Sequence, residues 1–107
     1  MSLQKMKEKL KKYRKENILL SSHVLKRCVQ RKISPKTIVE SILRPSGLTE
    51  VIEELISKTE SKYKLVFQLS NARNLALIVA MNDRIEVITA WIMINKWEKK
   101  VRRYGGI

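Results

Sequence analysis

The single histidine of this chain lies in a short segment, residues 21–34, that also holds two arginines at regular spacing. His23, Arg27 and Arg31 are four residues apart, so an α-helix would carry them on one face; we call these three side chains the His–Arg row. A histidine titrates near neutral pH and can take up or release a proton, and guanidinium groups hold phosphate oxygens. The spacing therefore predicts a surface that binds or cleaves phosphate esters.

The same segment has the features of a short helix that packs on a core. Ser21 or Ser22 can cap its first turn, because a serine oxygen accepts a hydrogen bond from a free backbone N–H. The positive end of the helix would attract phosphate and favour a neutral imidazole. A structural alternative stays open, in which the histidine caps or packs and the arginines pair with carboxylates, namely those of Glu50, Glu53 and Glu54. We expect four apolar side chains to face the core: Val24, Leu25, Cys28 and Val29.

The net charge of +13 on 107 residues is concentrated at the two ends of the chain. Residues 1–34 carry a net charge of +9, residues 35–94 are neutral, and residues 95–107 carry +4. A neutral body with basic ends is typical of a protein that binds a polyanion. We therefore expect RNA or DNA as a partner; the alternative is a basic surface that only keeps the protein in solution.

The composition also excludes several classes of protein. A lone cysteine, Cys28, cannot form an internal disulfide and is expected as a buried thiol in a reducing compartment. The sequence has no Cys/His cluster with metal-binding spacing, so we expect neither a metal site nor a cofactor. The N-terminus lacks the apolar run of a signal peptide, and every other apolar run is far shorter than the ~20 residues of a membrane helix. We therefore expect a cytoplasmic protein with no membrane partner.

Helices are predicted on both sides of a short strand in the N-terminal part. Residues 2–16 form a basic helix candidate, an extension spanning residues 1–17, and Ile18–Leu20 is a short edge strand candidate. Ser34-Pro35 suits the start of a helix after the His–Arg row, and Arg44-Pro45 suits its end. The two consecutive helices also resemble a helix-turn-helix, but the second has few exposed polar residues, which disfavours DNA reading by that route. The apolar stripe of the N-terminal helix is Leu3, Met6, Leu10 and Tyr13.

From Leu48 onward the hydrophobic period changes to that of strands, with β-branched and aromatic residues. Turn residues separate the strands, so we expect an antiparallel meander whose last two strands are central, with the helices on one face. The predicted fold class is α+β, with a four-stranded or slightly larger antiparallel sheet in a single domain of residues 18–104. Residues 95–104 return to helical spacing with a basic face. The strand candidates are Leu48–Leu55, Tyr63–Leu69, Leu75–Met81 and Arg84–Ile94.

The pattern His-x3-Arg-x3-Arg-x-Ile-Ser, followed by a helix, a Pro/Gly turn and a strand meander, resembles a small family of uncharacterised domains. That family is grouped with the RelE-type toxins in the barnase–EndoU–colicin–RelE ribonuclease superfamily, and the resemblance covers residues 18–94. Two positions depart from the family. Lys32 stands where a glycine is usual, which concerns only the exit of the helix. Trp91 stands where a tyrosine is usual, so any role for a phenolic hydroxyl there would be lost.

The resemblance implies a RelE-like, toxin-type endoribonuclease that cleaves RNA without a metal, through attack of the ribose 2′-hydroxyl on the adjacent phosphate. The His–Arg row would be catalytic, with the histidine as acid or base and the arginines on the phosphate oxygens. Trp91 would stack on a base. The remaining RNA-binding candidates are basic: Arg44, Lys62, Lys64, Arg73, Lys96 and Lys99.

A non-catalytic RNA- or DNA-binding module that uses the same basic faces is the alternative function. The resemblance also implies two further partners, ribosome-bound mRNA and an acidic antitoxin protein. The sequence leaves the oligomeric state open. The two functions differ in one observable, because only the enzyme converts RNA into product.

Overall fold

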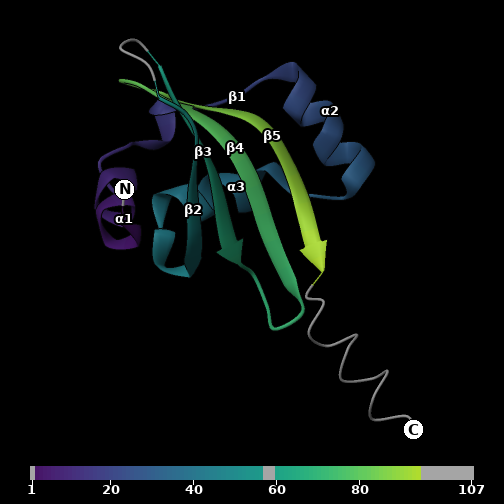
Figure 1. Ribbon diagram of the computed structural model, residues 1–107. Coiled ribbons are helices and arrows are strands. Elements are labelled where there is room, and N and C mark those ends of the chain that lie inside the picture. The colour runs from purple at the N-terminus through teal and green to yellow at the C-terminus, as the bar shows by residue number, and fades with distance from the viewer. Residues whose placement is uncertain (1, 57–59, 95–107) are drawn as a thin grey trace, which may run out of the picture.

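The computed structural model describes residues 2–56 and 60–94, the side chains of 55 and 56 excepted. The predicted α+β fold is confirmed, with helices packed against one face of a sheet (Figure 1). The predicted helix over 95–104 lies outside the described residues. The helices are α1 (Leu3–Leu10), α2 (Ser22–Arg31) and α3 (Pro35–Leu43), with 3-10 turns η1 (Lys15–Asn17) and η2 (Pro45–Gly47). The strands are β1 (Ile18–Leu20), β2 (Leu48–Ile56), β3 (Ser61–Gln68), β4 (Arg73–Met81) and β5 (Ile85–Ile94).

Within the described residues, the sheet has five strands in the order β1-β5-β4-β3-β2. β2 to β5 form the predicted antiparallel meander. β1 adds a short edge strand, as expected, but it runs parallel to β5 and pairs only with Ile85–Val87. The sheet is therefore mixed, and the described part of β5 continues beyond β1 with no strand on its outer side.

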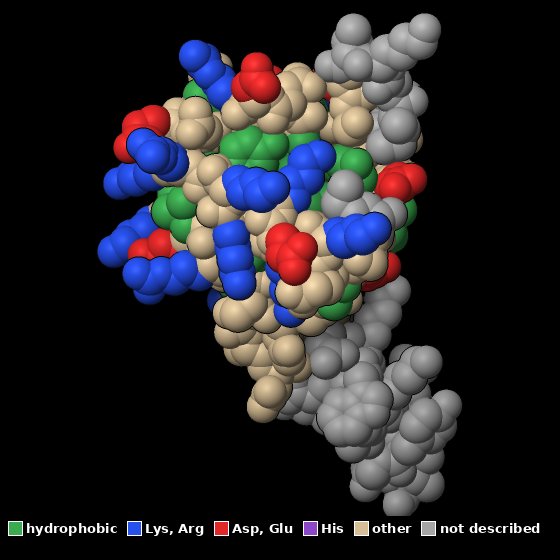
Figure 2. Space-filling model, turned by 90° about the vertical axis from the view of Figure 1, so that its left-hand side faces the viewer, with side chains coloured by type: hydrophobic (Ala, Val, Ile, Leu, Met, Phe, Trp, Pro, Cys, Tyr) green, Lys and Arg blue, Asp and Glu red, His purple; other side chains and the backbone are tan. Residues whose placement is uncertain are grey.

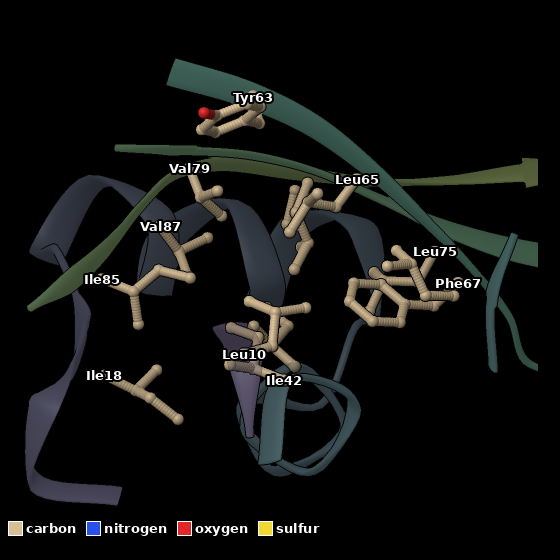
Figure 3. Close-up of a cluster of buried hydrophobic side chains, with 14 of the residues drawn as sticks. Leu10, Ile18, Ile42, Tyr63, Leu65, Phe67, Leu75, Val79, Ile85 and Val87 are labelled. Carbon is tan, nitrogen blue, oxygen red and sulfur yellow. The ribbon is translucent and has the colours of Figure 1, made fainter. Parts of the chain in front are cut away.

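The hydrophobic core lies between the sheet and the helices. On the core face, side chains line up across β3, β4 and β5; Leu65, Leu77 and Ala90 form one such row, and each is completely buried. Figure 3 shows Leu65, Val79 and Val87 of the sheet above Leu10 and Ile42 of the helices. Residues that alternate with these along each strand face the other side, which we call the open face.

The N-terminal helix α1 is part of this core. Met6 and Leu10 of the predicted apolar stripe are completely buried, and the Tyr13 hydroxyl donates to the Asn82 carbonyl oxygen at 2.7 Å. The helix ends at Leu10, earlier than predicted. After it the backbone forms a tighter turn, in which the Tyr13 N–H donates to the Leu10 carbonyl, and η1 then leads into β1. No helix among the described residues is long and apolar enough to cross a membrane.

Candidate nucleic-acid interface

The helix that carries the His–Arg row begins directly after β1. Ser21 caps it as predicted, since its Oγ accepts a hydrogen bond from the Val24 N–H at 3.1 Å. β1 pairs with β5, so α2 starts at that side of the sheet and contacts β5 along its length (Figure 1). The sequence order strand–serine–helix therefore fixes where the row begins.

The sequence predicted more buried residues on α2 than the structure shows. Val24 and Cys28 are buried, but Leu25 is 41% and Val29 81% exposed. Successive helical residues are 100° apart, so only one narrow side of the helix points to the sheet, and Leu25 and Val29 turn away from it. Cys28 is buried as predicted, and this burial raises the pKa of its thiol.

The end of α2 is a tight left-handed turn at Lys32. Its φ of 55° and ψ of 44° are those that glycine adopts most easily. The Ile33 N–H donates to the Cys28 carbonyl at 2.9 Å, which closes the turn and brings Ile33 into the core. Lys32 takes this conformation, which favours glycine, at some cost in strain.

The side chains of the His–Arg row are accessible. His23 is the second residue of α2, is exposed, and makes no hydrogen bond or ion pair with any residue that the structure describes. Arg27 is half-buried, and its Nη1 lies 3.5 Å from the Gln30 Oε1. The Arg31 Nη1 donates to the Ala90 carbonyl oxygen of β5 at 2.7 Å. The C-terminal member of the row, Arg31, therefore contacts β5.

The contact between Arg31 and Ala90 involves a carbonyl on a part of the sheet edge that no strand among the described residues pairs. β1 stops opposite Val87, so Arg31 takes the place of a strand as the partner of this carbonyl. A guanidinium group has five N–H donors, so one bond to a carbonyl leaves donors for a further acceptor. Arg31 thus joins α2 to β5 and still offers positive charge at the surface.

The open face, on the side of the sheet away from the core, carries further predicted RNA-binding residues. Trp91 follows the core residue Ala90 and lies on the open face, where it is half-buried. The Lys64 Nζ of β3 lies 5.6 Å from the centre of the indole ring, a cation–π distance. Lys62 alternates with Tyr63 and shares this face. Of the predicted RNA-binding residues, Lys64 and Trp91 are therefore in contact, and Lys62 lies on the same face, two residues before Lys64.

Other predicted binding residues lie apart from the His–Arg row. Arg44 ends α3 and lines a hollow with residues of α1, which contacts β2. β2 is three strands from β5, or ~14 Å, so Arg44 belongs to the other side of the molecule. Arg73 is exposed at the start of β4, opposite Ile94. Lys96 and Lys99 are outside the described residues. No group of His, Cys, Asp or Glu that could hold a metal ion is present in the described ranges.

Sequence reasoning missed a groove that involves α3. Two hollows of about 530 and 360 Å³ adjoin at Leu43 and Arg44. We call them together the α3 groove. Four of its cations are lysines from residues 7–15 and 36, which resemble ordinary solvent-exposed lysines in the sequence, and the fifth is Arg44, which was predicted to bind RNA. No local pattern indicates that these five side chains lie around one groove. The residues that line it are Lys7, Lys11, Lys15, Pro35, Lys36, Val39, Glu40, Leu43, Arg44, Pro45 and Ser46.

Comparison with known proteins gives one family. No curated protein and no solved structure matches the chain. A family described as a domain of unknown function, DUF4258, matches residues 20–92. The match begins at the last residue of β1 and ends within β5, so it includes the whole His–Arg row, Lys64 and Trp91, and leaves α1 outside. Since the match covers about two thirds of the sequence, the chain belongs to the DUF4258 family.

Proposed function

We propose that this protein is a RelE-like endoribonuclease that cleaves single-stranded RNA without a metal ion, at the His–Arg row. The observation that carries the proposal is the accessibility of the row: an exposed imidazole in the first turn of α2, without a partner among the described residues, is followed along the same helix by two arginines. The open face on the other side of the sheet, with Trp91 and Lys64, supports the choice of RNA, because aromatic rings stack on unpaired bases and cations hold the backbone.

The proposed reaction needs only groups of this chain and of the substrate, together with water. His23 takes the proton of a ribose 2′-hydroxyl, and the 2′-oxygen forms a bond to the adjacent phosphorus. The bond from phosphorus to the 5′-oxygen breaks, and the imidazolium or a water molecule protonates that oxygen. The products are a 2′,3′-cyclic phosphate and a free 5′-hydroxyl. Arg27 and Arg31 stabilise the extra negative charge on the phosphate oxygens.

A non-catalytic RNA-binding module is the second candidate, and one observation favours it. Arg31 is already engaged with the Ala90 carbonyl, and the hollows around α1 and α3 contain none of the row. Active sites are usually concave, whereas a convex helix side suits binding along a backbone. This candidate predicts salt-sensitive RNA binding without a product.

The experiment is cleavage of an end-labelled single-stranded RNA by the purified protein in EDTA. We expect product from the wild type, and a loss of at least ~10²-fold in rate for His23→Ala and for Arg31→Ala, the size of a catalytic acid–base or charge-stabilising contribution. Lys26→Ala is the matched control, since Lys26 is an exposed cation of the same helix outside the row. A substrate with a 2′-deoxy sugar at the cleaved position must stay intact.

Two results would refute the enzyme. Equal cleavage by His23→Ala and the wild type would remove the row from the chemistry and point to a contaminating nuclease. RNA that shifts in a gel but stays intact at every enzyme concentration would leave the binding module as the function.

A further inference from the structure

The α3 groove combines an apolar floor with a rim of one charge. Pro35, Val39 and Leu43 follow each other at four-residue spacing and form one stripe along α3, about 12 Å long. Val39 and Leu43 are only partly buried although they pack against the core. The floor is therefore an apolar strip that remains open to solvent within the described part of the protein.

The rim is mainly cationic. Among the described residues that line the groove, one carries a carboxylate, Glu40, whose Oε1 lies 3.9 Å from the Lys36 Nζ. Figure 2, which views the side of the molecule where α1 lies, shows mostly Lys and Arg side chains, with some Asp and Glu among them, beside patches of apolar surface. The cations that line the groove are Lys7, Lys11, Lys15, Lys36 and Arg44.

We propose that the α3 groove binds an amphipathic helix of an acidic partner protein. Such a helix lays apolar side chains at i, i+3, i+4 and i+7 into a groove of this kind, and its flanking carboxylates would meet the five cations. Two turns of helix are as long as the floor. The complementarity is of two types, apolar to apolar and negative to positive, and a single amphipathic helix provides both.

The chemistry of the groove argues against two other binding partners, an RNA backbone and a second copy of this chain. An RNA backbone would satisfy the cations but has no apolar surface to cover Val39 and Leu43. A second copy of this chain, with its net charge of +13, would bring like charge to the rim. The proposal does not depend on RNA cleavage, because the groove involves α1 and α3, whereas the His–Arg row lies beside β5.

The test uses the full-length protein and a fluorescein-labelled helical peptide of roughly 16 residues, with leucines at i, i+4 and i+7 and glutamates beside them. We expect micromolar binding by fluorescence anisotropy. Lys36→Glu should raise Kd by about 3- to 10-fold, as expected for reversal of a surface charge that faces a carboxylate. The Lys36 side chain is 82% exposed, so this variant folds. Lys26→Glu, with the same charge change on α2, should leave Kd within about twofold.

The apolar contribution is measured separately. Val39→Glu should raise Kd at least ~10-fold while circular dichroism shows a folded protein, and a peptide with alanine in place of each leucine should bind at least ~10-fold more weakly. Equal binding of the leucine and alanine peptides would overturn the proposal, since the groove would then be only a cationic surface. An absence of peptide binding would overturn it as well. If the wild type bound an oligouridine and Val39→Glu abolished that binding, RNA and not a protein would be the partner of the groove.

Discussion

Removal of the Arg31 side chain should destabilise the protein, in addition to any effect on RNA. The Arg31 Nη1 donates to the Ala90 carbonyl oxygen at 2.7 Å and links α2 to β5 across 59 residues of sequence. The carbonyl lies on the part of the β5 edge that β1 does not cover. In Arg31→Ala this oxygen keeps only water as a partner, and the aliphatic stem of the arginine no longer covers the edge.

The size of the effect follows from the type of bond. A hydrogen bond with a charged donor contributes about 1.5–3 kcal/mol when buried. This bond is only partly buried, so water compensates for part of the loss, and we expect a decrease of about 1–2 kcal/mol in the free energy of unfolding. For a domain of this size, each kcal/mol lowers Tm by about 4–8 °C.

The assay is urea unfolding at neutral pH, followed by circular dichroism. Arg27→Ala is the matched control, because the same substitution on the same helix removes only a 3.5 Å contact with Gln30 and should cost less than ~0.5 kcal/mol. Arg31→Lys should lie between Arg31→Ala and the wild type, since an ammonium group keeps the charge but not the planar fork. If the two alanine variants were equally stable, the link between α2 and β5 would have no energetic role.

Three further outcomes are expected. Lys32→Gly should raise the free energy of unfolding by about 0.5–1 kcal/mol, because glycine adopts the left-handed turn at residue 32 without strain; a loss of stability in urea would refute that reading of the turn. The folded protein should react with iodoacetamide at Cys28 at least ~100-fold more slowly than the urea-unfolded chain, since burial hides the thiol and raises its pKa; similar rates would show that α2 opens readily. Burial, then Asp83 and Tyr63, raise the pKa of Tyr13, so the folded state favours the protonated phenol. The stabilisation by its bond to Asn82, about 1 kcal/mol, should be present below the ordinary pKa of tyrosine and disappear as the pH rises through the raised pKa. A constant stability difference between Tyr13→Phe and the wild type across that range would contradict this.

Periodicity and turn chemistry in the sequence predicted most of the fold. The four long strands, the edge strand at Ile18–Leu20 and the cap at Ser21 all lie where local patterns place them. Local patterns succeed here because alternation and serine capping act within a few residues. The limits of α1 and the core face of α2 were less accurate. The end of α1 depends on a distant residue, because the chain between α1 and β1 turns to place Tyr13 on Asn82. The core face of α2 depends on the position of the sheet, from which Leu25 and Val29 point away.

The candidate site likewise has one feature that the sequence predicts and others that only the fold creates. The sequence by itself determined the His–Arg row, because a helical repeat of four residues sets three side chains on one side of any helix. Only the tertiary structure decided what the row adjoins. The parallel pairing of β1 with β5 brings α2 to the edge where Arg31 meets Ala90, and the register of β3, β4 and β5 brings Lys64 to Trp91. The packing of α1 and α3 likewise assembled the α3 groove. These contacts join residues far apart in the chain, and their positions follow from strand order and packing, which no local spacing encodes.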